Sequence, residues 1–258
     1  MIRALFLDVD GTLLSFRTHE VPASALEALA RAHERGVRLF IATGRAVGDL
    51  GPLAAIPYDG VVGLNGADCR LRDGRVVANR PIARDDFERA LELSDELDFP
   101  VGLELDEGIY VNRVTPVVEE LARLVAHPTP EVTDLRALFD RAACCQMCFY
   151  LDPELERQVM ARLPSLMSSR WCSLFVDVNV RGVDKATGLR EMAAHFGMAI
   201  SETMAFGDGG NDAPMLRAAG IGVAMGNGCD EALAAADYTT ASVDDDGILR
   251  ALEHFGVI

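Results

Sequence analysis

The sequence is poor in positive charge and has no long apolar run, and each shortage excludes a class of protein. Lysine and arginine together number 24, against 40 aspartates and glutamates, so the formal net charge is -16. Such an acidic surface repels nucleic-acid phosphate and anionic lipid, which excludes nonspecific nucleic-acid binding and a polybasic membrane anchor. No apolar stretch approaches the roughly 18 residues that span a bilayer. We therefore expect no nucleic-acid partner and no membrane partner. A small anionic ligand stays compatible with this charge, because a few local cations can dominate a cleft.

The sequence also lacks the marks of secretion and of a zinc ribbon. The opening segment, MIRALFLDVDGTLL, has one basic residue and a short apolar run. That run meets Asp8 and Asp10 where a signal peptide has a small-residue cleavage site. Cys145 and Cys148 form a Cys-x-x-Cys pair, but no second pair follows at zinc-ribbon spacing. We interpret the cysteines as reduced core thiols and expect a cytoplasmic protein.

Strands and helices alternate at the start of the chain. Half of the 258 residues are apolar (50%), enough for one large core or two modest ones. Continuous apolar runs are typical of parallel strands buried on both faces, and helices between them predict a right-handed parallel α/β sheet. The expected elements are a strand at 4–9, a helix at 22–35, a strand at 37–42, a short helix from Ala46 and a strand at 61–64.

The middle of the chain changes character, and the alternation returns near Asp184. Residues 67–78, with Asp73-Gly74 at the centre, predict a hairpin. Paired strands and helices without strict alternation then indicate an inserted α+β module. Its expected elements are helices at 84–97, 116–125 and 153–163, and strands near 101–105, 109–111, 142–151 and 171–178. We predict a core of residues 1–81 and 183–258 with an insert at 82–182.

The first chemical motif is DVDGTL, from Asp8 to Leu13. Residues i and i+2 of a strand face the same way, so Asp8 and Asp10 project together from the carboxyl end of the first strand. Open α/β sheets bind ligands at that edge. Two carboxylates so close repel each other unless a cation lies between them. An Asx turn accounts for Asp10 and Gly11 but leaves Asp8 unexplained.

Two further segments supply groups that can hold an anion. Thr43 and Gly44 follow the second apolar strand, where a hydroxyl and exposed backbone N–H groups form an anion cradle, with Arg45 beside them. The alternative is a threonine helix cap and a surface arginine. Lys185 follows Asp184, a predicted helix cap, so its charge opposes the helix dipole by about 0.3–1 kcal/mol. Many surface lysines tolerate that cost, so each segment alone favours the structural alternative.

The fourth motif is GDGGNDAPM, from Gly207 to Met215. Asp208 and Asp212 offer the oxygen ligands that hard cations prefer, and Asn211 lies between them. A capped acidic turn does not require two adjacent glycines and an asparagine. All four motifs fall at the carboxyl end of a core strand or at the helix start after it. Carboxylates, a hard cation, one lysine and helix-terminal N–H groups together form a site for phosphoryl transfer.

These motifs, with LNGA at Leu64–Ala67 and GVAMGN at Gly222–Asn227, resemble the haloacid dehalogenase (HAD) superfamily, in particular its Cof-type phosphatases. The resemblance covers essentially the whole chain. It implies a Rossmann-like core and, at residues 82–182, a type IIB α/β cap that closes over the core as a lid. It also implies a Mg²⁺-dependent phosphomonoesterase that acts on small phosphorylated metabolites, hexose phosphates among them.

The resemblance assigns a role to each site position. Asp8 corresponds to a nucleophile that forms an aspartyl-phosphate, and Asp10 to the acid/base. The remaining positions are phosphate-binding Thr43, Gly44, Lys185 and Asn211, metal-binding Asp8, Asp10 through its carbonyl and Asp208, and the supporting residues Asp212, Arg45 and Asn65.

Several alternatives stay open. A sugar phosphomutase would use the same two aspartates, and nucleotides or pyridoxal phosphate are competing substrates. A non-enzymatic phosphate-binding module would tolerate loss of Asp8 or Asp10, and both are present. In the insert, Asp177 and Asn179 either meet sugar hydroxyls or face solvent. Arg170 and Trp171 could lie near the mouth of the site, with the indole stacked on a sugar ring, but we interpret Arg170 as an exposed arginine and Trp171 as a partly buried structural residue. We expect a monomer or a weak homo-oligomer.

Overall fold

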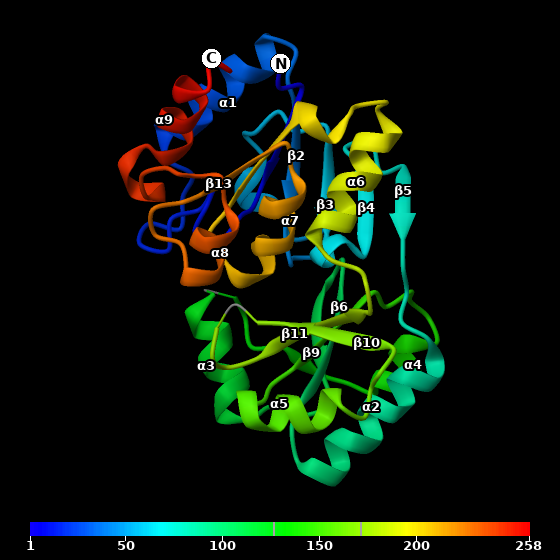
Figure 1. Ribbon diagram of the computed structural model, residues 1–258. Coiled ribbons are helices and arrows are strands. Elements are labelled where there is room, and N and C mark those ends of the chain that lie inside the picture. Colours follow the sequence, from blue (N-terminus) through cyan, green and yellow to red (C-terminus); the bar gives the residue numbers. More distant parts are fainter. Residues whose placement is uncertain (126, 171) are drawn as a thin grey trace. The chain divides into compact units, whose positions relative to one another are not determined.

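The computed structural model describes residues 1–125, 127–170 and 172–258, so the interpretation of Trp171 lies outside the described residues (Figure 1). The chain forms two compact units. One comprises Met1–Asn79 and Val183–Ile258, and the other comprises Arg80–Gly182. No helix among the described residues is both long enough and apolar enough to cross a bilayer.

The first unit is built on an eight-stranded sheet in the order β14-β13-β12-β1-β2-β3-β4-β5. Neighbouring strands run parallel from β14 through β3, and β4 and β5 add an antiparallel hairpin at one edge. The strands are β1 Ala4–Leu7, β2 Arg38–Ala42, β3 Gly60–Gly63, β4 Asp68–Leu71, β5 Val76–Asn79, β12 Thr203–Gly207, β13 Ile221–Ala224 and β14 Tyr238–Thr239. The predicted α/β fold with a parallel core sheet is confirmed.

Helices cover both faces of this sheet (Figure 1). They are α1 Ala23–Glu34 and α9 Gly247–His254 on one face, and α6 Lys185–His195, α7 Ala213–Ala218 and α8 Asp230–Ala235 on the other. The alternation along β1 divides the core: Leu5 and Leu7 pack with the α1 side, while Phe6 packs with the α6 side. Burying each of these side chains contributes about 1.5–3 kcal/mol, which fixes the strand that ends in the first motif.

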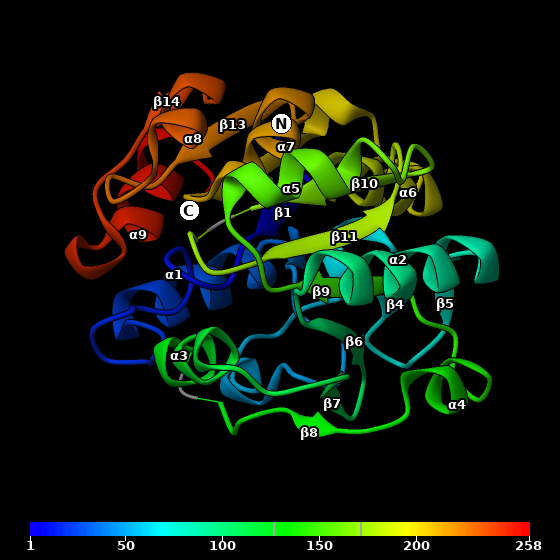
Figure 2. The same cartoon turned by 90° about the horizontal axis from the view of Figure 1, so that it is seen from below.

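The second unit has a six-stranded sheet in the order β10-β11-β9-β6-β7-β8. Its strands are β6 Val101–Leu105, β7 Gly108–Val111, β8 Glu131–Val132, β9 Gln146–Phe149, β10 Leu166–Ser169 and β11 Val176–Val180. Its helices are α2 Arg84–Leu97, α3 Pro116–Leu124, α4 Leu135–Phe139 and α5 Pro153–Met160. Figure 2 shows α2 and α5 together on one face of this sheet, where they pack on Met147 and Val178. Asp177 and Asn179 alternate with Val176 and Val178 along β11, so they belong to the opposite face.

Two predicted elements are wrong. The short helix from Ala46 is absent, and only the one-turn 3-10 helix η1 at Gly51–Leu53 follows β2. The Arg45 carbonyl, which a helix would pair four residues on, accepts the N–H of Leu64 instead at 3.1 Å. The strand predicted near 171–178 is the later β11, and β10 before it was not predicted because it ends in two serines.

Four of the six cysteines are buried, and Arg170 of the insert is held by hydrogen bonds. None of the six cysteines, all of them among the described residues, forms a disulfide; Cys69, Cys144, Cys145 and Cys148 are buried, Cys172 is half-buried and Cys229 is exposed. The interpretation as core thiols therefore fails at Cys229. Arg170 is half-buried where we expected an exposed arginine: its side chain is 19% exposed and donates to Glu156 at 2.9 Å and to two backbone carbonyls. Asp177 and Asn179 are buried, so the solvent-facing alternative is wrong, and Asn179 donates to the Cys145 carbonyl at 3.0 Å.

Candidate active site

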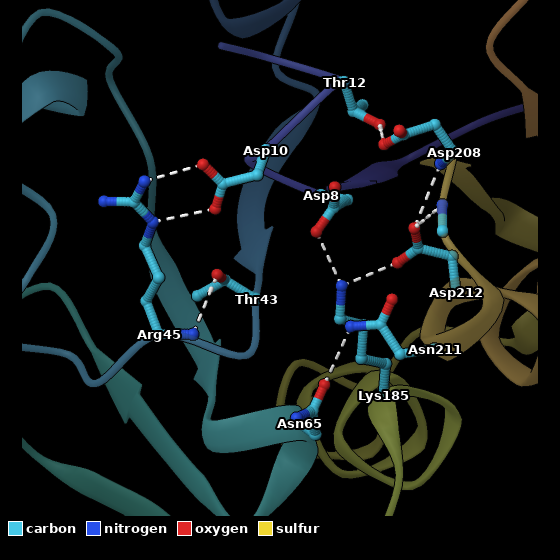
Figure 3. Close-up of polar contacts among 11 residues, drawn as sticks. Asp8, Asp10, Thr12, Thr43, Arg45, Asn65, Lys185, Asp208, Asn211 and Asp212 are labelled. Carbon is cyan, nitrogen blue, oxygen red and sulfur yellow. Dashed lines mark hydrogen bonds and ion pairs between the residues drawn. The ribbon is translucent and has the colours of Figure 1, made fainter. Parts of the chain in front are cut away.

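Four segments distant in sequence meet at one edge of the first unit's sheet (Figure 3). Strands β1, β2 and β12 are parallel neighbours, with Leu7 paired to both Ile41 and Phe206. The residues that follow these strands therefore emerge side by side, as expected for the carboxyl ends of a parallel sheet. They are Asp8 and Asp10 after β1, Thr43 to Arg45 after β2, and Asp208 to Asp212 after β12, and the start of α6 adds Lys185.

Lys185 lies at the centre of this group and is the only lysine in the chain. Its ammonium is fully buried and lies 2.6 Å from Asp8 Oδ1 and 2.6 Å from Asp212 Oδ1. The start of α6 approaches closely because the facing turn carries Gly66, at φ 93°; a Cβ there would lie 2.1 Å from the Asp184 carbonyl oxygen. Only glycine fits that position, which explains part of the LNGA motif.

The surroundings shift the protonation of these groups. Burial raises the pKa of Asp8 well above its ordinary value, the charge of Asp212 raises it further, and Lys185 acts in the opposite direction. Burial and the charge of Asp212 raise the pKa of Asp208 to about 7. Burial by itself would lower the pKa of Lys185, but the charges of Asp212 and Asp8 outweigh it, so that pKa is raised. With all groups ionised, three carboxylates and one ammonium leave two negative charges in excess, which suits a divalent cation.

The oxygens present fit a hard metal ion. Asp8, Asp208 and Asp212 each place one carboxylate oxygen within 4.8 Å of the other two. Asp212 supports the other two, because Lys185 and the N–H groups of Asp208 and Gly209 occupy its two oxygens at 2.6, 3.0 and 2.9 Å. Asp8 and Asp208 remain as the direct side-chain ligands, and carboxylate oxygen is the donor that Mg²⁺ prefers. A Cβ at Gly11 would lie 2.2 Å from Asp208 Oδ2. Any side chain at this position would block that oxygen, whereas glycine leaves it accessible.

The opposite side of the group offers donors for an anion. The Thr43 hydroxyl oxygen accepts the N–H of Arg45 at 3.0 Å, which leaves its hydrogen to donate elsewhere, and Gly44 lies in the bend between them. Asn65 has a left-handed backbone (φ 53°) and donates its N–H to the Thr43 carbonyl at 2.9 Å. Its side-chain oxygen accepts from Asn211 Nδ2 at 3.0 Å. Asn65 therefore links the segments that carry Thr43 and Asn211.

Arg45 binds Asp10 directly. Nε donates to Asp10 Oδ2 at 2.8 Å and Nη2 donates to Oδ1 at 2.6 Å, while Nη1 lies 3.2 Å from Asp49 Oδ2. Burial opposes the charged guanidinium, but the bonds to Asp10 more than offset it and raise the pKa of Arg45. The predicted site residues are thus all found in one group, with Asp10 turned toward Arg45 and Asp8 toward Lys185 (Figure 3).

Two residues of the group had no predicted role. The Thr12 hydroxyl donates to Asp208 Oδ1 at 2.9 Å. The Asn227 amide donates to the Gly11 carbonyl at 2.8 Å and lies 3.5 Å from Asp208 Oδ2, while its oxygen accepts the N–H of Val243 at 2.9 Å. Both residues belong to motifs read from the sequence, DVDGTL and GVAMGN, and their inclusion there was the only available signal.

Comparisons with known proteins show the family. A family model described as haloacid dehalogenase-like hydrolase matches residues 5–252. The chain is 29% identical to the putative phosphatase YkrA of Bacillus subtilis, over 99% of this chain and 98% of that protein. It is 31% identical to an HMP-PP phosphatase of Serratia proteamaculans, over 88% and 85% of the two chains.

Solved structures show the same architecture over the full chain. The structure of BT1666 from Bacteroides thetaiotaomicron, studied among phosphatases of the haloalkanoate (HAD) enzyme superfamily, is similar at a TM-score of 0.96 and 54% identity, and the match covers 100% of this chain and 96% of that one. The HAD subclass IIB sugar phosphatase BT4131 is similar at a TM-score of 0.91 and 36% identity, with 99% and 100% covered.

Proposed function

We propose a substrate and a mechanism on the premise that the chain belongs to the haloacid dehalogenase-like hydrolases and is a phosphatase of that family. The proposed substrates are monophosphate esters of small metabolites, with hexose phosphates preferred and Mg²⁺ as cofactor. The observation that carries the proposal is the Asp8 carboxylate, buried and held 2.6 Å from the Lys185 ammonium at the point where four segments meet. The sugar specificity draws on the similarity to a subclass IIB sugar phosphatase.

In the first step, an Asp8 carboxylate oxygen attacks phosphorus. The bond from phosphorus to the ester oxygen breaks, and its electron pair goes to that oxygen, which takes the proton of the Asp10 carboxyl group. The products are a free alcohol and an aspartyl-phosphate at Asp8. Lys185 balances negative charge beside the reacting oxygen, while Thr43 and Asn211 donate to the non-bridging phosphate oxygens.

In the second step, water attacks the phosphorus of the aspartyl-phosphate. The Asp10 carboxylate accepts a proton from this water, which restores its acid form. The bond from phosphorus to the Asp8 oxygen breaks, and the electron pair returns to the carboxylate. One ester and one water are consumed, and one alcohol and one inorganic phosphate are released.

A magnesium ion would be held by Asp8, Asp208 and the Asp10 carbonyl. When bound, it would supply positive charge that offsets the repulsion between the Asp8 carboxylate and the phosphate dianion. Asp212 holds the loop of Asp208 through its two backbone N–H bonds at 3.0 and 2.9 Å. The insert, residues 82–182, is in this proposal the type IIB cap that selects the leaving group.

The test is a phosphate-release screen with Mg²⁺ over hexose phosphates, nucleotides, pyridoxal phosphate and HMP-PP. HMP-PP is included because relatives at 29–31% identity are named HMP-PP phosphatases. We expect hexose phosphates to have the highest kcat/KM and to release phosphate without a bisphosphate activator. Another class at the top overturns the substrate assignment, and dependence on a bisphosphate favours the mutase. Multiple turnover by Asp8→Asn with an unchanged far-UV spectrum refutes the mechanism.

A further inference from the structure

The Arg45 guanidinium donates hydrogen bonds to both carboxylate oxygens of Asp10. The two hydrogen bonds, 2.8 Å from Nε and 2.6 Å from Nη2, run side by side in the plane that a guanidinium and a carboxylate can share (Figure 3). Such two-pronged pairs fix orientation as well as proximity. Among the described residues, no other side chain hydrogen-bonds the Asp10 carboxylate.

Arg45 is the better anchored partner of the pair. Its backbone N–H donates to Thr43 Oγ1 at 3.0 Å, and its carbonyl accepts the N–H of Leu64 at 3.1 Å. Its third guanidinium nitrogen lies 3.2 Å from Asp49 Oδ2, four residues along the chain. The Arg45 side chain is 16% exposed, against 34% for that of Asp10. The arginine is therefore held at several points, and the position of the Asp10 carboxylate depends on it.

The placement of Asp10 matters for the two proton transfers of the proposed reaction, and only the first of them depends on the leaving group. Asp8 is oriented by Lys185, so nucleophilic attack does not depend on Arg45. Proton transfer to the ester oxygen does depend on where the Asp10 carboxyl group points, because general acids act only within hydrogen-bond reach.

We propose that Arg45 is the positioning residue of the acid/base: its two-pronged contact sets the rotamer and plane of the Asp10 carboxyl group and so governs proton delivery to the leaving oxygen. The inference rests on the proposed function, in which Asp10 is the acid. In this role Arg45 affects catalysis only where the leaving oxygen needs a proton, whereas a residue that binds phosphate directly would affect every substrate equally.

Two substrates separate these roles. A hexose 6-phosphate releases a strongly basic alkoxide that needs a proton, whereas p-nitrophenyl phosphate releases a phenolate that stabilises its own charge. We expect Arg45→Ala to lower kcat/KM, which reports the steps through leaving-group release and not the later hydrolysis of the aspartyl-phosphate, by about 10²-fold for the hexose phosphate, within the range for loss of a general acid, and by less than about tenfold for the aryl phosphate. KM should not rise for either substrate. The ratio of the two rates on one preparation does not depend on the fraction of folded enzyme, so partial misfolding cannot imitate the effect.

Matched variants make each failure distinct. Asp10→Asn should show the same selective loss, and the double variant should be no more selective than Asp10→Asn alone. Equal loss on both substrates in Asp10→Asn refutes the acid role, and the inference fails with it. The inference alone fails if Asp10→Asn loses activity selectively but Arg45→Ala loses it equally on both substrates, or raises KM for both. In that case the proposed function still holds. Arg45→Lys keeps the positive charge but loses the two parallel N–H donors of the guanidinium. A wild-type ratio of the rates on the two substrates in that variant also overturns the inference. Arg3→Ala, at an exposed ion pair with Glu202, is the charge-removal control and should leave the ratio unchanged.

Discussion

Replacing Lys185 with methionine tests the electrostatic centre of the molecule, because the change keeps most of the volume and removes the only lysine. The wild-type ammonium lies 2.6 Å from a carboxylate oxygen on each side and has no exposed surface. Its loss leaves Asp8 and Asp212 buried without a counter-charge. Removing one partner from a buried ion pair costs about 3–5 kcal/mol. We therefore expect the free energy of unfolding to fall by about 3–5 kcal/mol at pH 8 without divalent metal.

The shifted pKa values of Lys185 and Asp8 determine how the loss of stability in Lys185→Met changes with pH. Because the Lys185 pKa is raised above its ordinary 10.5, the stability it contributes is complete below 10.5 and disappears only as the pH rises through the folded value. The Asp8 pKa is also raised, so that carboxylate favours folding at acid pH and opposes it increasingly as the pH rises. The difference between wild type and Lys185→Met should therefore be smaller at pH 5 than at pH 8.

Urea unfolding followed by far-UV circular dichroism measures the difference. The two units can unfold separately, so each transition is fitted by itself. Adding Asp212→Asn to the variant removes one of the two uncompensated charges and should recover part of the loss. A loss below about 1 kcal/mol at pH 8, or an equal loss at pH 5, would refute the reasoning.

Three further predictions concern groups around the site and in the cores. Because Lys185 is the only lysine, carbon-13 labelling of lysine gives one ε-methylene NMR signal. Its chemical shift should remain that of a charged ammonium above pH 10.5, since the pKa of Lys185 is raised. A titration midpoint at or below pH 10.5 contradicts the pairing of Lys185 with the two aspartates. Asn227→Ala removes an amide beside Asp208, so the Mg²⁺ concentration for half-maximal activity should rise about tenfold or more, and an unchanged titration curve counts against that support. Burial raises the pKa of Cys144 to about 12, whereas Cys229 is exposed. Iodoacetamide at pH 8 should therefore label Cys229 and spare Cys144 in peptide mass spectra, and equal labelling would show that the second unit's core is open.

The meeting of the four motifs was predictable because it follows from topology. Parallel strands end at a common edge, so polar residues placed just after the apolar runs of β1, β2 and β12 must be neighbours. Asp8, Thr43 and Asp208 needed no side-chain detail to be placed together. The alternation of strands and helices likewise predicted the parallel sheet, because that pattern depends only on local burial.

The contacts that were not predicted depend on rotamers and on the path of the backbone. Spacing placed Arg45 near the site but could not show that its guanidinium grips Asp10, because that requires both side-chain torsions. Asn227 lies far along the chain from the Gly11 carbonyl that it binds. The helix expected from Ala46 failed for a tertiary reason, the bond from the Leu64 N–H to the carbonyl of Arg45, which no local pattern contains.

The stereochemical course at phosphorus distinguishes attack by Asp8 from direct attack by water. An isotopically chiral thiophosphate ester, hydrolysed in labelled water, shows whether the phosphoryl group is displaced once or twice. Attack by Asp8 followed by attack of water inverts phosphorus twice, so we expect net retention of configuration. Net inversion would mean that water attacks the substrate directly, and it would contradict Asp8 as the nucleophile.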